Sequence, residues 1–261
     1  MKIAVSGKGG VGKTLVAGVL AEFLVRRGFK VLAIDADPAP NLALTLGISL
    51  AESNKIVPIS EDKELIESKT KTDFEGVYHL SFTVDDIIEK FAVESPYGVN
   101  VLVMGTVRSA GQGCTCPANA VIRALLRHLL VARDEAVVMD MEAGVEHMGR
   151  GTAKHVDTML IVADPGMKAL ETAKKIHRLA NEAGLKRIFL VGNKAASPKG
   201  EQTIKEFTTR NRIPLLGLIP FDNMLLEADM LGEPPFRYAD DSKTLAIIHE
   251  MGQKLLEGAA A

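Results

Sequence analysis

The hydrophobic residues of this chain gather in seven short runs that are almost entirely apolar. These runs occupy residues 3–5, 31–34, 101–104, 136–139, 159–162, 188–191 and 215–218. Stretches with the residue spacing of amphipathic helices lie between several of them, over residues 14–27, 119–132 and 169–183. Strands that are apolar on both faces and alternate with helices are typical of a parallel sheet covered on both sides. The pattern therefore predicts an α/β fold with one doubly wound, mostly parallel sheet.

Two segments depart from this alternation. Residues 50–76 are rich in Lys, Glu and Asp, which predicts a solvated insertion of mixed helix and loop; the alternative is a segment that contacts a partner and responds to nucleotide. Residues 245–256 have the pattern of an amphipathic helix with a single lysine, Lys254. A membrane-targeting helix carries more cations, so we expect this one to pack on the core. No repeat or Pro/Ser-rich linker interrupts the chain, and we predict a single domain over residues 1–261.

Composition and charge narrow the possible partners. The chain has 261 residues, 47% of them hydrophobic, and its 31 basic and 33 acidic side chains give a net charge of -2. This balance offers no electrostatic footprint for nucleic acid or an anionic membrane. No apolar run approaches the roughly 18 residues that span a bilayer, and the first residues lack the features of a signal peptide. We therefore expect a cytoplasmic protein without nucleic-acid or membrane partners.

A candidate phosphate-binding loop follows the first apolar run. Residues 7–14 read GKGGVGKT, which is the GxxxxGK[ST] pattern between a strand and a helix. Glycines allow the backbone amides of such a loop to turn inward around a phosphate, and the start of the helix adds a positive dipole end. Lys13 is expected to bridge the β- and γ-phosphates of a nucleotide, and Thr14 to bind Mg²⁺. The remaining predicted contacts come from Gly9, Gly10, Val11, Gly12 and Leu15.

Aspartates follow or close two of the apolar runs. Asp35 and Asp37 follow the run at 31–34, and Asp140 ends the run at 136–139. The carboxyl ends of parallel strands are where ligands bind in such sheets. We expect Asp140 to hold Mg²⁺ through a water, and the other two to hold Mg²⁺ through water or to orient the attacking water. The alternative for Asp35 and Asp37 is that they cap a helix.

The two cysteines, Cys114 and Cys116, stand one residue apart. A disulfide between residues this close is strained. Pro117 suits the first turn of a helix, where the dipole favours the thiolate form that binds soft or borderline metal ions. One chain supplies two sulfurs, whereas a zinc-like site takes four ligands, so a two-fold dimer would complete the site. The alternative is a pair of buried thiols without a metal.

A second lysine in the loop, Lys8, gives the sequence KGGVGKT. This sequence resembles the deviant Walker A family, which includes nitrogenase iron protein, septum-site ATPases, plasmid-partition ATPases and metal-centre maturation ATPases. The resemblance implies hydrolysis of ATP to ADP and phosphate in a face-to-face homodimer. There Lys8 would reach the partner's nucleotide, as an arginine finger does; the alternative is a solvated loop lysine. The implied catalytic residues are Lys8, Lys13, Asp37 and Asp140.

The same resemblance assigns residues beyond the loop. Asp37 matches the switch I aspartate that positions water, Asp35 has an outer-shell role, and Gly144 matches the switch II glycine. Asn193 matches a residue that hydrogen-bonds the adenine edge. The second wall of the implied base pocket is formed by Pro220, Phe221 and Asp222.

The segments KGGVGKT, DADPAPNL, CxC and DMEAGVEHMGRGTA together resemble the CooC-type nickel-insertion ATPase family. The resemblance covers nearly the whole chain and is weakest over residues 50–100. It implies an ATP-dependent metallochaperone that binds Ni²⁺, or Zn²⁺ in the same site, at Cys114 and Cys116 across a homodimer. The client would be carbon monoxide dehydrogenase or acetyl-CoA synthase. Leu15 departs from the pattern, because many relatives have a second hydroxyl residue there, and one α-phosphate contact would be lost.

Two other functions fit parts of the sequence. A spatial-organising ATPase of the partition or septum-site kind predicts a cationic DNA-binding surface or a basic membrane helix, and leaves the cysteines unexplained. An iron–sulfur carrier or reductase would use four thiolates equally well. Nitrogenase iron protein takes its cysteines from two separate segments, however, whereas here both lie in one loop.

Overall fold

The structure is a computed structural model of the chain. It describes residues 1–37, 39–62, 64–65, 85–105, 125–130, 135–143, 155–239 and 241–258. The predicted metal-binding cysteines Cys114 and Cys116, the predicted switch glycine Gly144 and the second part of the charged insertion lie outside these residues.

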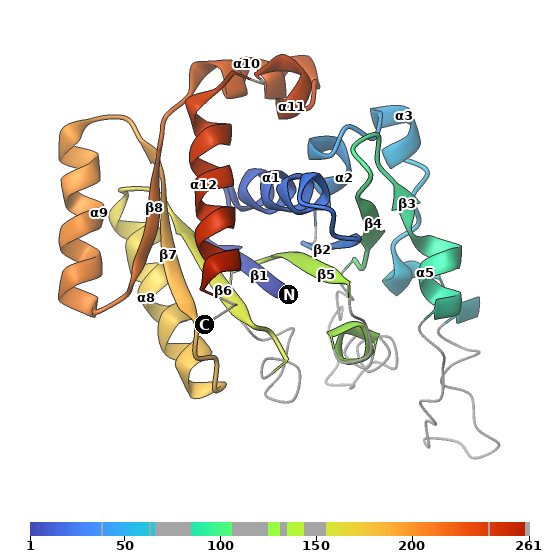
Figure 1. Cartoon of the computed structure of the whole chain (residues 1–261), viewed down its shortest axis with the longest axis horizontal. Helices are drawn as coiled ribbons and strands as arrows, with labels where there is room; N and C mark the ends of the chain where they lie inside the picture. Colours follow the sequence, from blue (N-terminus) through green and yellow to red (C-terminus); the bar gives the residue numbers. More distant parts are fainter. Residues whose placement is uncertain are drawn as a thin grey trace, which may run out of the picture.

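A single twisted sheet organises the described chain, with the strand order β3-β4-β2-β5-β1-β6-β7-β8 (Figure 1). The strands are β1 (Lys2–Gly7), β2 (Val31–Ala36), β3 (Val93–Glu94), β4 (Asn100–Val103), β5 (Ala136–Met141), β6 (Thr158–Ala163), β7 (Ile188–Ala195) and β8 (Leu215–Pro220). All neighbouring pairs are parallel except β3 and β4. The seven strands predicted from apolar runs are confirmed. The short antiparallel edge strand β3 was not predicted, because two residues carry no periodic signal.

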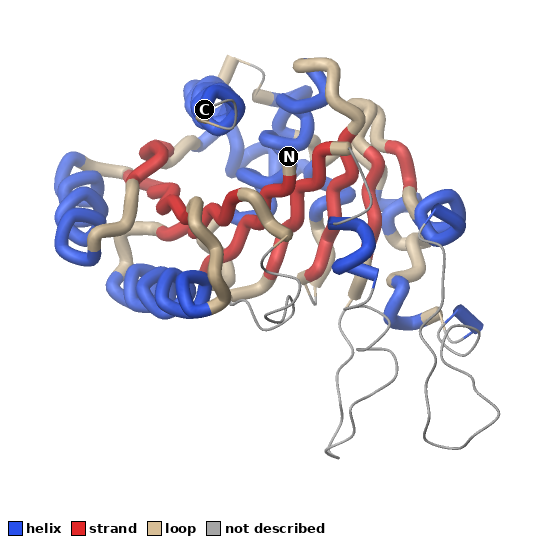
Figure 2. The backbone as a smooth tube through the Cα atoms, turned by 60° about the horizontal axis from the view of Figure 1, so that its bottom comes forward, coloured by secondary structure: helices blue, strands red, loops and turns tan. Residues whose placement is uncertain are grey.

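Helices cover both faces of this sheet, as the alternating pattern predicted. They are α1 (Lys13–Arg26), α2 (Leu42–Thr45), α3 (Leu50–Ser53), α5 (Asp85–Phe91), α8 (Met167–Glu182), α9 (Pro198–Asn211), α10 (Asn223–Leu231), α11 (Pro235–Tyr238) and α12 (Lys243–Glu257), with a 3₁₀ turn η1 (Ile59–Glu61). Helix α12 packs beside α1, and α8 packs beside α9. Figure 2 shows the C-terminal helix on one side of the sheet and α8 with α9 on the other.

Three of the predicted helices are confirmed as α1, α8 and α12, and the predicted helix at 119–132 is helical over its described residues 125–130. Helix α1 is the most buried of them because it lies between the sheet and α12. Helix α12 begins at the cap residue Ser242, whose hydroxyl accepts from the Thr244 amide at 3.0 Å. Its apolar face, including Leu245, Ile248 and Met251, is buried. In the part of the chain that the structure describes, no helix is long and apolar enough to cross a membrane.

The charged insertion begins as a mixture of helix and loop, as expected, but its first half is not simply solvated. Ile59 is fully buried and Leu65 is nearly so. The amide of Ser60 donates to the carbonyl of Met104, at 3.0 Å, just beyond the end of β4. The expectation of a solvated segment is therefore wrong for this part, because two apolar residues among the charged ones anchor it to the sheet.

Candidate nucleotide-binding site

The phosphate loop joins β1 to α1 at the carboxyl edge of the sheet. Gly10 and Gly12 have φ angles of 80° and 93°, in the left-handed region that glycine adopts without strain. Among the described residues, the amides of Gly9, Gly10 and Gly12 donate to no protein acceptor. Helix α1 has no side-chain cap at its first turn. A loop with undonated amides at a helix N-terminus has the chemistry of a phosphate site, so these residues fit a nucleotide phosphate.

The two residues after Gly12 lead to two separate aspartates. The ammonium of Lys13 lies 3.7 Å from Asp37 Oδ2, and its side chain is nearly buried. The hydroxyl of Thr14 donates to Asp140 Oδ2 at 2.6 Å. The structure therefore brings together four residues that the sequence predicted separately. Leu15, the departure from the family pattern, packs its side chain against the core.

Asp140 is held in an environment that disfavours its charge. It is 1% exposed, and its second oxygen, Oδ1, is buried without a hydrogen-bond partner among the described residues. Burial raises the pKa of this carboxyl to about 7, although the Thr14 hydrogen bond and the charge of Lys13 act in the opposite direction. A divalent cation would relieve both the burial of the charge and the missing partner. Asp140 and Thr14 therefore fit the Mg²⁺ site that the sequence predicted.

Asp35 lies directly opposite Asp140 on the neighbouring strand, yet its oxygens are used differently. They accept the amides of Asp37, Asn41 and Leu42, at 3.1, 2.9 and 2.9 Å. Burial raises the pKa of Asp35 to about 6, although these amide hydrogen bonds lower it. Because Leu42 begins α2, Asp35 organises the loop after β2 in the way that the capping alternative proposed.

The end of β7 contacts the phosphate loop from the side. Asn193 is buried, and its amide nitrogen donates to the carbonyl of Val11 at 2.7 Å. Its side-chain oxygen accepts the backbone amide of Lys194 at 2.8 Å. The ammonium of Lys194 in turn donates to the carbonyl of Gly10 at 2.8 Å. The sequence identified Asn193 as a base-binding residue, but it did not indicate that either residue supports the loop.

The end of β8 supplies the other predicted wall of the base pocket. Pro220 ends the strand, and the side chain of Phe221 is 44% exposed. Asp222 caps α10 by accepting the Met224 amide at 3.0 Å, and it also accepts the Ser242 hydroxyl. Burial raises the pKa of Asp222, but these hydrogen bonds outweigh it and hold the pKa below its usual value. Asp222 thus links α10 to the start of α12, whereas the ring of Phe221 stays partly exposed.

Two predicted features, Lys8 and the cysteine pair, take no part in the contacts described above. Lys8 is exposed at the tip of the loop, where it is available to a second molecule. Cys114 and Cys116 lie outside the described residues, and among the residues that are described no group of three His, Cys, Asp or Glu side chains could hold a metal ion.

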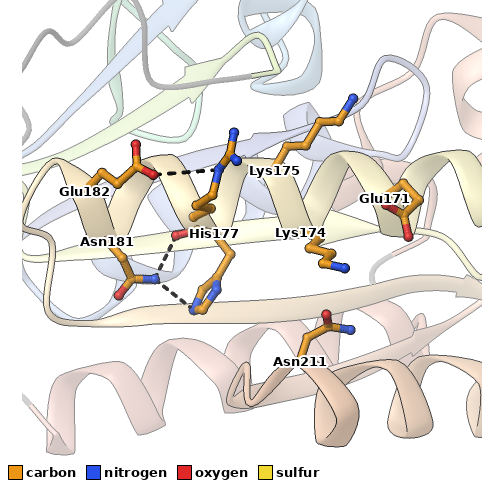
Figure 3. A pocket seen from close by; sticks show the side chains of 8 residues that line it. Glu171, Lys174, Lys175, His177, Asn181, Glu182 and Asn211 are labelled. Atoms are coloured by element: carbon orange, nitrogen blue, oxygen red, sulfur yellow. Dashed lines mark hydrogen bonds and ion pairs between the residues drawn. The ribbon is translucent and has the colours of Figure 1, made fainter.

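A groove elsewhere on the surface lies between α8 and α9 (Figure 3). The side chains that line it carry both charges, and burial lowers the pKa of His177. Asn181 contacts the His177 ring at 3.1 Å. No lining residue belongs to the phosphate loop or to the aspartate cluster, so this groove is separate from the candidate nucleotide site.

Comparison with known proteins agrees with this geometry. The family model of the CobQ/CobB/MinD/ParA nucleotide-binding domain matches residues 2–236. The carbon monoxide dehydrogenase accessory protein CooC of Rhodospirillum rubrum is 45% identical over 234 residues, which cover 89% of this chain and 88% of that protein. An uncharacterised ATP-binding protein of Methanocaldococcus jannaschii is 40% identical over 237 residues, 90% of each chain.

Among solved structures, the MinC:MinD cell division complex of Aquifex aeolicus contains a chain with the same fold. Its TM-score is 0.72 at 19% identity, and the match covers 98% of this chain and 96% of that chain. At 19% identity, the structural similarity establishes the fold alone. The two sequence relatives, at 45% and 40% identity, establish the family. The chain therefore belongs to the CobQ/CobB/MinD/ParA family of nucleotide-binding P-loop proteins, in which it is a CooC-type member.

Proposed function

We propose that this protein is a dimeric ATP hydrolase that assists nickel insertion into carbon monoxide dehydrogenase or acetyl-CoA synthase. The observation that carries the proposal is the 45% identity, over 234 residues, to a protein whose name is carbon monoxide dehydrogenase accessory protein. The arrangement of Lys13, Thr14, Asp37 and Asp140 around the phosphate loop supports the nucleotide part. The pair Cys114 and Cys116 in the sequence supports the metal part.

In the proposed reaction, the oxygen of a water forms a bond to the γ-phosphorus of ATP, and the bond to the β–γ bridging oxygen breaks to release ADP. The loop amides and Lys13 hold the phosphates. Mg²⁺ held near Thr14 and Asp140 would neutralise charge on the β- and γ-oxygens. The Lys13–Asp37 ion pair is the contact that a γ-phosphate would replace. Its replacement would free Asp37 to orient the attacking water.

The position of Lys8 supports the proposed dimer. An exposed lysine within the loop adds little to the phosphate site of its own chain, but it can approach the nucleotide of a second subunit. A cation supplied in trans stabilises the charge of the transition state. ATP binding would therefore favour a face-to-face homodimer, and hydrolysis would weaken it.

The cargo is proposed to bind where the two subunits meet. Two thiolates from each Cys114–Cys116 pair give four soft ligands, which suit Ni²⁺ and also Zn²⁺. Because the same nucleotide holds the subunits together, ATP would change the affinity of this shared site. Metal transfer to the client enzyme would then be coupled to the nucleotide cycle.

The test is metal and nucleotide binding by the wild type and by the Cys114→Ser/Cys116→Ser variant. Both proteins are titrated with Ni²⁺ and with Zn²⁺, in the presence and absence of Mg²⁺-ATP, and ATP hydrolysis is followed in parallel. We expect one metal ion per dimer for the wild type, an affinity that changes with ATP, and no stoichiometric metal for the variant. The variant should still bind ATP.

Three outcomes would contradict the proposal in different places. Equal metal binding by both proteins would remove the role of the cysteines. Strong visible absorbance of the purified wild type, lost in the variant, would favour an iron–sulfur cluster instead of nickel. Full ATP hydrolysis by a Lys8→Ala variant would contradict the action of Lys8 in trans, whereas a Lys13→Ala variant should lose nucleotide binding altogether.

A further inference from the structure

We infer that Lys194 is a positioning residue of the phosphate loop, which it holds in the conformation that receives a nucleotide phosphate. Its ammonium lies 2.8 Å from the carbonyl oxygen of Gly10, 184 positions earlier in the chain. The inference rests on the proposed nucleotide-binding function, and it assigns a role to a residue that lies outside the phosphate-loop sequence.

The contact matters because of the direction in which it holds a peptide group. In a trans peptide the carbonyl and the following amide point in opposite directions. Lys194 binds the carbonyl of Gly10, while the amide of the same peptide group, that of Val11, donates to the carbonyl of Lys8 at 3.4 Å. Asn193 does the same one residue later: it binds the carbonyl of Val11 at 2.7 Å, and the amide of Gly12 points away from β7. The two neighbours thus hold two successive peptide groups of the loop from the β7 side, and the Gly12 amide, which donates to no acceptor among the described residues, stays available to a phosphate.

The loop lies close to β7, and this limits which residues fit in it. A Cβ atom at Gly12 would lie 2.3 Å from the side-chain nitrogen of Asn193, so the loop approaches β7 more closely than any other residue would allow. Gly10 has open space around it, and its requirement is the φ of 80°. The direction of the Gly10–Val11 peptide therefore depends on two contacts, the Lys194 ammonium at its carbonyl and the Lys8 carbonyl at its amide.

The backbone of Lys194 gives a second, independent indication. Its φ is 55°, and within the described chain only one other residue that is not glycine, Arg212 with φ 54°, has a positive φ. A lysine in this region is strained, and glycine or asparagine would adopt the same conformation more easily. Only a lysine or arginine there could send a cation across to the loop. The contact that its side chain makes with Gly10, and not its backbone preference, therefore accounts for a lysine at position 194.

The chain offers a matched control for this strain. Arg212 ends α9 with the same backbone conformation, but it makes no contact with the phosphate loop. A glycine at either position relaxes the backbone, and only the one at position 194 removes a contact to the loop. Comparison of Lys194→Gly with Arg212→Gly therefore separates the effect of the ammonium from the effect of the backbone.

The experiment measures ADP and ATP dissociation constants, together with the urea midpoint of the apo protein, for the wild type, Lys194→Gly, Lys194→Asn, Lys194→Arg and Arg212→Gly. Loss of one hydrogen bond from a charged donor that is open to solvent should weaken nucleotide binding by about three- to tenfold in Lys194→Gly and Lys194→Asn. Their urea midpoints should stay equal or rise, because strain is relieved. Lys194→Arg should restore affinity to within about twofold, and Arg212→Gly should leave it unchanged.

Two other combinations of nucleotide affinity and urea midpoint would overturn the inference. If Lys194 were only a turn residue, Lys194→Gly and Lys194→Asn would bind nucleotide as the wild type does. If its role were only to hold the fold, affinity and urea midpoint would fall together. A wild-type protein that binds neither ADP nor ATP would overturn the proposed nucleotide function, and this inference with it, so the two failures are distinguishable.

Discussion

A buried carboxylate lies near each end of helix α1, Asp140 of β5 at its first turn and Glu22 of α1 itself toward its last, and their surroundings differ. At its first turn, Thr14 contacts Asp140, whose second oxygen has no partner within the described chain and whose pKa is raised. Two turns further on, Glu22 of α1 is buried with a side-chain nitrogen facing each of its oxygens. Arg26 binds one of its oxygens, and the other, Oε2, has no hydrogen bond within the described chain but lies 3.3 Å from Nε2 of His249 in α12. Although burial raises the pKa of Glu22, its partners lower it below the usual value.

The difference separates a carboxylate that is prepared for a ligand from one that belongs to the architecture. A buried carboxylate with a partner nitrogen beside each oxygen, as in Glu22, ties together the elements that supply those nitrogens. A buried charge that is left incomplete destabilises the protein alone and is relieved when a cation binds. Around Glu22 the packing is correspondingly tight: the rings of Phe23 and His249 are 5.5 Å apart, and a Cβ at Gly252 would lie 2.6 Å from Phe23.

The largest expected effect is on catalysis, when Asp140 is changed. Asp140→Asn should reduce the rate of Mg²⁺-dependent ATP hydrolysis by at least about 100-fold, because removal of one element that positions the cation costs that much in comparable sites. The free energy of unfolding of the apo protein should stay equal or increase, since a buried unpaired charge has been removed. Turnover at saturating Mg²⁺-ATP and urea unfolding measure the two quantities.

A control for this change is Asp157→Asn. Asp157 is exposed at the opposite edge of the sheet, where its carboxylate accepts the Lys2 amide at 2.8 Å. It removes the same charge without touching the nucleotide site, and hydrolysis should stay within about twofold of the wild type. If Asp140→Asn retained more than a tenth of the activity, or destabilised the apo protein as strongly as a structural residue does, the two ends of α1 would not differ as described.

The next largest expected effect is on stability, when Glu22 is changed. Glu22→Ala should lower the free energy of unfolding by about 2–3 kcal/mol, because the Arg26 hydrogen bond and the His249 contact are lost and a small cavity forms. Nucleotide affinity should stay within about twofold, since Glu22 faces α12 and not the loop. Urea unfolding and ADP titration of the same protein test this. Arg26→Gln should cost less than about 1 kcal/mol, because that guanidinium is largely exposed and exposed pairs contribute little.

The smallest effect is on the pH dependence of stability. Because the folded-state pKa of Glu22 lies below the value of 4.5 that applies without these contacts, the unfolded chain takes up its proton first as pH falls. The contribution of Glu22 is thus complete above about pH 5 and is lost as pH falls below 4.5 through the lowered folded-state pKa. The groups that face it are Arg26 and His249.

Comparison of wild type with Glu22→Gln between pH 6 and pH 3 isolates this contribution from the other carboxylates. The difference in unfolding free energy between the two proteins should be constant at the upper end and shrink toward the lower end. A difference that instead grows as the pH falls would mean that Glu22 is incompletely paired, and the contrast with Asp140 would disappear.

Much of the fold was predictable because its signals are local. Seven buried strands follow directly from apolar runs, and α8 and α12 from amphipathic spacing. Helix α9 was missed because it is polar and buries only Ile204 and Thr208. The anchoring of the charged insertion by Ile59 was missed for a similar reason, since one apolar residue among charged ones has no period. The edge strand β3 exists only because β4 lies beside it.

The site shows the same division. The sequence by itself determined the phosphate loop, because its glycines, lysines and threonine are contiguous and their conformational requirements are local. It also placed the aspartates at strand ends. Only the tertiary structure decided what each one does: the register that sets Asp35 opposite Asp140 leaves one carboxylate surrounded by amides and the other short of a partner. The contact of Lys194 with Gly10 likewise depends on β1 and β7, which only the folded sheet brings to either side of β6. Contacts between distant segments depend on packing, and no spacing along the chain encodes them.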